Sequence, residues 1–204
     1  MFYKISILKK MMKEAYKGMG LHVGQTVTGW LVIRTGHWEL CQDFETVPKE
    51  VKGAIMELTG EIPLKGTFYK AVDKECNQYE LEADVRMLPL RYPEIDKGEE
   101  GEITRILMVG VFDIYAVATV YDKGEGYTVL LKQNQAQLVT PEGIEVEAGE
   151  TPIYGPYIGG RREIIWHNSD TWYCTAPVIP EKDRTDTLKL YNDIAKMCGN
   201  TALK

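Results

Sequence analysis

The sequence predicts an α+β protein built mainly of antiparallel β-hairpins, with about three helices over residues 4–17, 47–59 and 185–198. Apolar residues recur at helical spacing in these three stretches, and β-branched and aromatic residues gather in short runs between glycine-containing turns. The 204 residues are 44% hydrophobic and 26% charged, which is the composition of a folded globular chain. That composition excludes disordered, collagen-like and coiled-coil classes.

Each expected helix has recognisable ends. Gly18 follows the first helix and Gly60 follows the second. Pro48 lies in the first turn of the second helix, where the missing N–H of proline has no helical partner to lose. Thr185 or Asp186 caps the last helix.

The expected strands fall on both sides of a segment with linker character. Residues 88–102 combine prolines, glycines and many charges. The sequence therefore predicts an N-terminal α+β lobe over 1–88, an acidic linker over 89–102, and a β-rich lobe with the C-terminal helix over 103–204. The expected strands are 27–35, 38–44, about 66–72, 78–87, 103–112, 114–121, 127–133, 163–167 and 171–176.

Two segments share the pattern G-E-x-P-x-x-G-x-aromatic, namely Gly60–Phe68 and Gly149–Tyr157. A hairpin pattern precedes each of them, over residues 29–44 and 114–133. One interpretation is two related lobes, in which the two segments occupy equivalent places. The other is a chance match between similar turns.

Charge is unevenly distributed along a chain whose net charge is −6. Residues 1–20 carry five lysines and Glu14, a net charge of +4. These lysines are either the solvated face of a helix or a surface for nucleic acid or an anionic membrane.

Residues 75–102 carry nine acidic and three basic residues, a net charge of −6. If Glu80, Glu82 and Asp84 lie on one strand, they share a face at about 6.5–7 Å spacing, close to the spacing of phosphates along a nucleic-acid strand. They would then bind a protein's basic channel in place of nucleic acid. The alternative is that they keep an edge strand soluble.

The most specific local feature is the segment Tyr154–Arg162, expected within a loop over 149–162. Tyr154, Tyr157, Arg161 and Arg162 are the residue types that dominate binding surfaces. We therefore expect a solvent-exposed loop that contributes to partner binding. The alternative is a hairpin turn whose aromatic rings fold back onto the core.

No residue constellation indicates catalysis or a cofactor. The chain has three histidines and lacks the P-loop, the dinucleotide-binding fingerprint and the short Cys or His spacings of zinc sites. His37 and Cys41 would share one strand face and could bind zinc with Cys76 or Cys174, but these cysteines fit small core residues better. We expect a non-enzymatic protein without metal or cofactor.

The expected compartment is the cytoplasm. No apolar run reaches the roughly 18–20 residues that span a bilayer, and the lysines of residues 4–17 do not precede an apolar core as in a secretory signal. The four cysteines show no short paired spacing, which fits a reducing environment. No membrane partner is expected.

Leu8–Gly18 and Val47–Pro63 resemble uncharacterised small proteins of phages and mobile elements in gut Firmicutes. The resemblance covers about residues 4–85 and implies an accessory protein of a mobile element, of which many counter host defence. An anti-CRISPR-type inhibitor, bound to a Cas nuclease or another nucleic-acid-processing complex in the host cell, is the function it suggests. The alternative is direct binding of nucleic acid or nucleotide through Lys, Arg and Tyr side chains.

Overall fold

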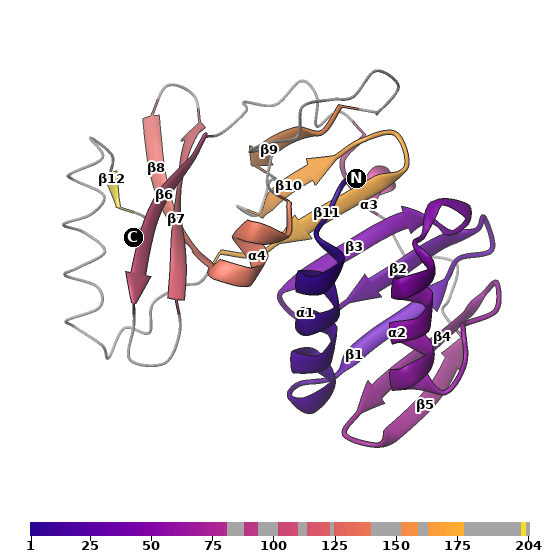
Figure 1. Cartoon of the computed structure of the whole chain (residues 1–204). Helices are drawn as coiled ribbons and strands as arrows, with labels where there is room; N and C mark the ends of the chain where they lie inside the picture. Colours follow the sequence, from indigo (N-terminus) through magenta and orange to yellow (C-terminus); the bar gives the residue numbers. More distant parts are fainter. Residues whose placement is uncertain are drawn as a thin grey trace.

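The structure is a computed structural model that describes residues 1–80, 88–93, 102–109, 114–122, 125–139, 152–158, 163–177 and 201–202. Within these ranges the chain forms an α+β fold with one large antiparallel sheet, one smaller sheet and four helices. Figure 1 shows the smaller sheet lying beside the large one. The α+β class predicted from the sequence is therefore confirmed.

The large sheet has eight strands in the order β5-β4-β1-β2-β3-β11-β10-β9. Every neighbouring pair in it is antiparallel. The strands are β1 (Leu21–Gln25), β2 (Trp30–Arg34), β3 (Trp38–Asp43), β4 (Thr67–Val72), β5 (Glu75–Glu80), β9 (Tyr154–Ile158), β10 (Ile164–His167) and β11 (Thr171–Thr175).

The smaller sheet has four strands in the order β12-β8-β7-β6. Antiparallel pairing joins β6 to β7 and β7 to β8, whereas β12 lies parallel to β8. The strands are β6 (Glu102–Val109), β7 (Ile114–Asp122), β8 (Glu125–Lys132) and β12 (Thr201–Ala202).

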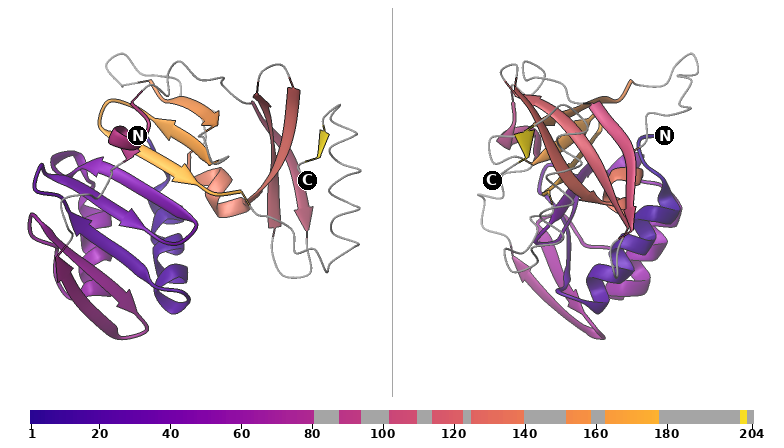
Figure 2. Two further views of the ribbon diagram at one scale, coloured as in Figure 1. Left: turned by 180° about the vertical axis from the view of Figure 1, so that it is seen from behind. Right: turned by 90° about the vertical axis from the view of Figure 1, so that its left-hand side faces the viewer.

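Two helices cover one face of the large sheet. Helices α1 (Ile5–Lys17) and α2 (Lys49–Thr59) lie side by side across it, as Figures 1 and 2 show. Helix α4 (Gln133–Leu138) follows β8 directly and contacts α1. The backbone N–H of Lys4 donates to the carbonyl of Leu138 at 3.0 Å, which ties the start of α1 to the end of α4.

Both faces of the large sheet carry apolar side chains. Because side chains alternate along a strand, one strand contributes residues to both faces. Under α1 and α2, the apolar faces of both helices belong to one buried cluster that also includes Leu21, Ile33 and Trp166 of the sheet. On the opposite face, Val32 and Ile165 belong to a second cluster, which the short helix α3 (Leu88–Arg91) joins through Leu88.

The two predicted N-terminal helices and the hairpin between them are confirmed, with boundaries that differ by a few residues. Strand β1 was not predicted. Its Gly24 gives it a weak strand pattern, but a Cβ at that position would lie 2.0 Å from Cδ1 of Phe68, so the glycine marks a close approach between β1 and β4. The helix expected over 185–198 lies outside the described residues.

The loop expected over 149–162 is wrong at residues 154–158, which form the edge strand β9. Pro156 and Gly155 suggested a loop, but an edge strand tolerates proline because one side of it needs no ladder hydrogen bonds. Residues 88–91 of the expected linker form α3. The strand expected over 78–87 begins earlier, at Glu75.

The large sheet takes strands from both predicted lobes. Strand β11 pairs with β3, from Thr171 opposite Gln42 to Thr175 opposite Trp38, and so continues the N-terminal sheet across the expected boundary. Each of the two repeated segments ends inside a strand, β4 for the first and β9 for the second, and these two strands differ in their pairing. Strand β4 returns to β1, whereas β9 leaves the sheet of β7 and β8 and pairs with β10. This difference contradicts equivalent places for the two segments.

Candidate functional site

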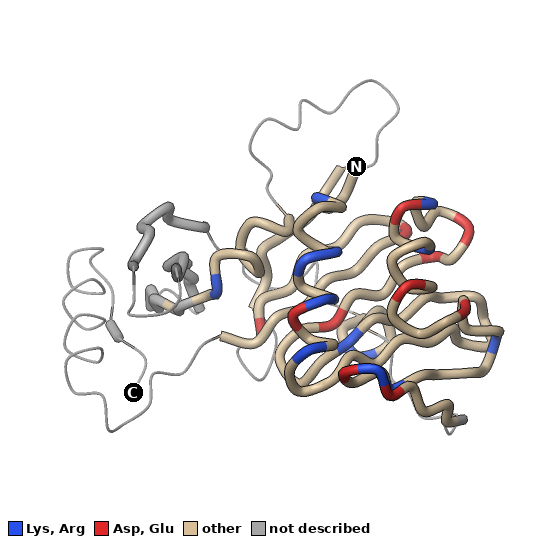
Figure 3. The backbone as a smooth tube through the Cα atoms, turned by 60° about the horizontal axis from the view of Figure 1, so that its bottom comes forward, with Lys and Arg blue, Asp and Glu red and all other residues tan. Residues whose placement is uncertain are grey.

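Helix α1 separates an apolar face from a lysine face. Leu8, Met11 and Met12 are buried against the sheet. Lys10, Lys13 and Lys17 are exposed, and their spacing of three, four and seven residues places them on one side of the helix. We call Lys10, Lys13 and Lys17 the lysine face. Figure 3 shows basic residues recurring along α1.

The acidic neighbours of the lysine face neutralise it weakly. Lys10 Nζ lies 3.8 Å from Glu14 Oε1, and Lys13 Nζ lies 3.6 Å from Glu57 Oε2 of α2. All four side chains are more than half exposed, so solvent and salt screen both pairs. In the described part of the chain, Lys17 has no ion pair.

The N-terminal end of α1 is an unfavourable place for a positive charge. Lys4 is the N-cap residue and makes no side-chain capping bond, and the first turn contains no acidic residue. A positive charge at this end opposes the helix dipole. Helix stability therefore does not account for the placement of Lys4.

A pocket of about 270 Å³ opens at the C-terminal end of α1. It lies between this helix, the turn that joins β2 to β3, and the start of α4. We call it the α1–α4 pocket. It is lined by Met11, Glu14, Ala15, Gly18, Met19, Gly20, Thr35, His37, Trp38, Lys132, Asn134 and Gln135.

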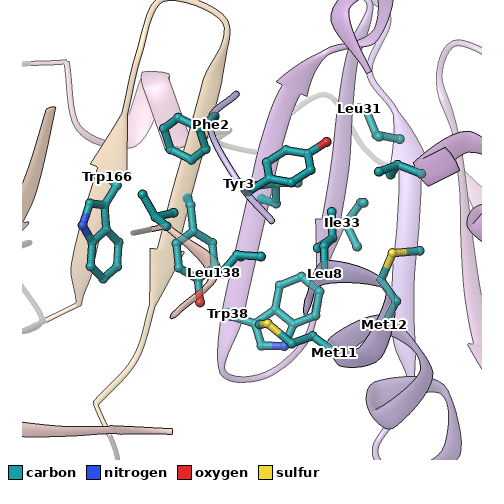
Figure 4. Packing of buried hydrophobic residues seen from close by; sticks show 14 of the residues in the cluster. Phe2, Tyr3, Leu8, Met11, Met12, Leu31, Ile33, Trp38, Leu138 and Trp166 are labelled. Carbon is teal, nitrogen blue, oxygen red and sulfur yellow. The ribbon is translucent and has the colours of Figure 1, made fainter. Parts of the chain in front are cut away.

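The α1–α4 pocket combines an apolar wall with polar groups. Met11 and Trp38, seen together in Figure 4, are buried and belong to the main core. Glu14 lines the pocket, and Asn134 Nδ2 donates to its two carboxylate oxygens over 3.5 and 3.4 Å. These distances exceed the ordinary range for such bonds, so the carboxylate is loosely held. The wall and the polar groups together can hold a small planar ligand.

The predicted tyrosines come together around a histidine. Tyr154 is 45% exposed, whereas Tyr157 is buried at 6%. Both rings stack on His167, at centroid distances of 5.4 and 5.8 Å, and Trp172 stacks on the same ring at 4.3 Å. The expected exposure of Tyr157 is therefore wrong. A register shift between Ile165 and His167 lets β9 present both tyrosines to one ring.

The other predicted site residues are not brought together by the described structure. Arg161, Arg162, Glu82 and Asp84 lie outside the described residues, and Glu80 is the last residue of β5. Partner binding through these residues stays a prediction.

Two of the cysteines considered for zinc are buried in the sheet. Burial raises the pKa of the Cys41 thiol well above its usual value and that of Cys174 to about 12. Cys76 is exposed on β5. Across the described residues, no three His, Cys, Asp or Glu side chains gather to form a metal site.

No helix among the described residues is both long and apolar enough to cross a bilayer.

No family model and no curated protein matches the chain. Among solved structures, it is similar to a crystal structure described as a putative DNA polymerase III beta subunit from Eubacterium rectale ATCC 33656. The two share 10% identity with a TM-score of 0.33, over 92% of this chain and 67% of that chain. A similarity this low assigns neither a function nor a site.

Proposed function

We propose that this protein binds nucleic acid without catalysis, through the lysine face of α1. The observation that carries the proposal is the row of exposed lysines on a helix whose opposite face is fixed in the core. A rigid support matters because it holds the charges in one line before a ligand arrives. The net charge of +4 in residues 1–20 stands against −6 for the whole chain.

The geometry of the lysine face suits a phosphate backbone. Lys10 and Lys17 are seven residues apart, which is roughly 10 Å along a helix. Their long side chains can reach successive phosphates and release the counterions condensed there. Lysine acts at such a site as a flexible point charge, so the lysine face supplies affinity without sequence specificity.

The test is the salt dependence of binding to a short labelled oligonucleotide. The double variant Lys10→Gln/Lys17→Gln removes two charges and leaves the Lys13–Glu57 pair intact. If each lysine neutralises one phosphate, the slope of log K against log salt becomes shallower by about 1.4–1.8. The matched control, Lys65→Gln/Lys70→Gln, removes the same charge from exposed positions outside α1.

Equal slopes for the parent and the Lys10/Lys17 variant would contradict the proposal. Equal losses in both double variants would also contradict it, because they would show that only net charge matters.

A second candidate is the inhibitor of a nucleic-acid-targeting defence complex, such as a Cas nuclease, acting by protein–protein binding. It is favoured by two exposed apolar side chains, Val27 at 78% and Leu64 at 74%. They lie on neighbouring loops, because the N–H of Gly66 donates to the carbonyl of Gln25 at 2.7 Å. Exposed apolar residues that recur at one place are typical of protein contacts.

The inhibitor hypothesis is tested with a purified Cas effector. Val27→Ser/Leu64→Ser should abolish co-purification with the effector, whereas Met19→Ser, which changes an exposed methionine elsewhere, should not. If the parent neither co-purifies with the effector nor inhibits its cleavage, this candidate is wrong.

A further inference from the structure

We propose that the α1–α4 pocket receives one unpaired guanine base of the nucleic acid bound on α1. The inference rests on the proposed function, and it adds a base preference that the lysine face alone does not supply.

The pocket and the lysine face share an edge of α1. Glu14 lines the pocket, and Lys10 Nζ lies 3.8 Å from its carboxylate. Lys17 lies one turn further along the same helix, three residues after Glu14. A strand whose phosphates lie on Lys10 and Lys17 therefore passes the pocket mouth, and an unpaired base can turn into it.

The carboxylate of Glu14 selects the kind of base. A carboxylate beside phosphates is unfavourable unless it accepts hydrogen bonds from the ligand. Guanine carries a ring N–H and an amino group side by side on its Watson–Crick edge, so both can donate to one carboxylate. Adenine, cytosine and thymine lack this pair of adjacent donors.

The remaining pocket residues complement the rest of the base. Asn134 Nδ2 holds Glu14 through long bonds of 3.5 and 3.4 Å, so guanine donors can replace it. The freed amide of Asn134 and the ammonium of Lys132 then supply donors for the acceptor atoms O6 and N7. Met19, which is 69% exposed, and Ala15 provide apolar contacts for the ring face. The volume of about 270 Å³ is large enough for one base.

The experiment measures the affinity of the parent for thymidine dodecamers that carry one central guanine, inosine, adenine or cytosine. Inosine keeps the ring N–H of guanine and lacks its amino group. We expect the guanine oligomer to bind roughly tenfold more tightly than the adenine and cytosine oligomers, with inosine between them.

Two carboxylate variants separate base recognition from general charge. Glu14→Gln should abolish the preference for guanine, because an amide offers only one acceptor oxygen. Glu57→Gln is the matched control. It also removes a carboxylate beside a lysine of the lysine face, but Glu57 lies on α2, away from the pocket. It should keep the preference in full.

Failure of this inference is distinguishable from failure of the proposed function. Salt-dependent binding of all four oligomers with equal affinity overturns the guanine pocket and leaves the lysine face standing. A guanine preference that survives in Glu14→Gln also overturns the pocket. If the parent binds none of the oligomers, the proposed function is wrong, and this inference with it.

Discussion

Helices α1 and α2 lie side by side on one face of the same sheet, yet their outer faces differ. Both bury an apolar face, with Leu8 and Met12 from α1 and Val51 and Ile55 from α2. The outer face of α1 carries mostly lysines. That of α2 mixes acidic and basic residues and includes Gly53, whose added Cβ would meet nothing.

The ends of the two helices differ in the same way. Helix α2 has Glu50 in its first turn and ends at Gly60, which adopts the left-handed conformation with φ of 86°. Both features stabilise a helix. Neither helix has a side-chain capping bond at its N-terminus, but α1 has Lys4 as its N-cap residue and no acidic residue in its first turn.

This difference in charge distinguishes the roles that we expect for the two helices. The charges of α2 offset one another, because Lys49 lies beside Glu50 in its first turn and Glu57 lies near its end. The charge of α1 is mostly positive, and Lys4 at its N-terminus opposes the helix dipole. A protein that keeps unfavourable charges on an exposed helix commonly uses them at a binding surface. The comparison therefore favours α1 over α2 as the proposed site for nucleic acid.

The largest expected effects come from the buried faces, where the two helices should behave alike. Leu8→Ala and Ile55→Ala each remove a fully buried side chain from the main core. Each should lower the free energy of unfolding by about 2–5 kcal/mol. Chemical denaturation measures the loss. A much smaller loss for Leu8→Ala would mean that α1 is not fixed on the sheet.

Two glycine substitutions, one in α2 and one directly after it, should change the stability of the protein in opposite directions. Gly60→Ala places a Cβ in the left-handed region and should destabilise the protein by about 1 kcal/mol. Gly53→Ala adds a helix-favouring methyl in open space and should stabilise it by about 1 kcal/mol. Thermal unfolding distinguishes the two. If Gly53→Ala destabilises the protein, the surface of α2 at Gly53 is not open and the expectation is wrong.

Lys4→Ser should raise the stability of the protein and lower its affinity for oligonucleotide. Serine is a good N-cap residue and lysine is not, so the variant should be more stable by about 0.5–1 kcal/mol. It should also bind oligonucleotide somewhat less tightly, because it removes one positive charge from the helix that carries the lysine face. Denaturation and oligonucleotide titration on the same sample measure both. A gain in stability with no loss of affinity would limit the site to the lysine face.

The smallest expected effect is a pH dependence at His22, on the face of the sheet away from both helices. Burial, with the charges of Arg34 and Lys70, lowers the pKa of His22 below its usual value of 6.5. The unfolded state therefore binds the proton more readily, and His22 reduces stability as the pH falls below about 6.5. His22→Gln should lose less stability than the parent between pH 7.5 and 5.5. An equal loss in the two proteins would contradict this account.

The sequence predicted the elements whose pattern is local. The helical spacing of Leu8 and Met12, and the positions of Gly18 and Gly60, located both N-terminal helices because helix ends depend on neighbouring residues. The sequence did not predict that β11 pairs with β3, since no local pattern specifies which strands meet across more than a hundred residues.

The candidate site was predicted in part. The lysines of α1 were visible as a basic segment with helical spacing. The α1–α4 pocket was not, because Glu14 and Asn134 are 120 residues apart and meet only in the folded chain. The tyrosines of β9 were recognised as aromatic, but the stacking of both rings on His167 and the burial of Tyr157 depend on a register shift that the sequence does not show.

The most direct test of the account compares α1 and α2 within one sample of the parent protein. Lysine acetylation is followed by mass spectrometry with and without a saturating oligonucleotide. We predict that the oligonucleotide protects Lys10, Lys13 and Lys17 from acetylation, while Lys49 of α2, Lys65 and Lys70 react as before. Equal protection of α1 and α2, or protection confined to the lysines outside α1, would contradict it.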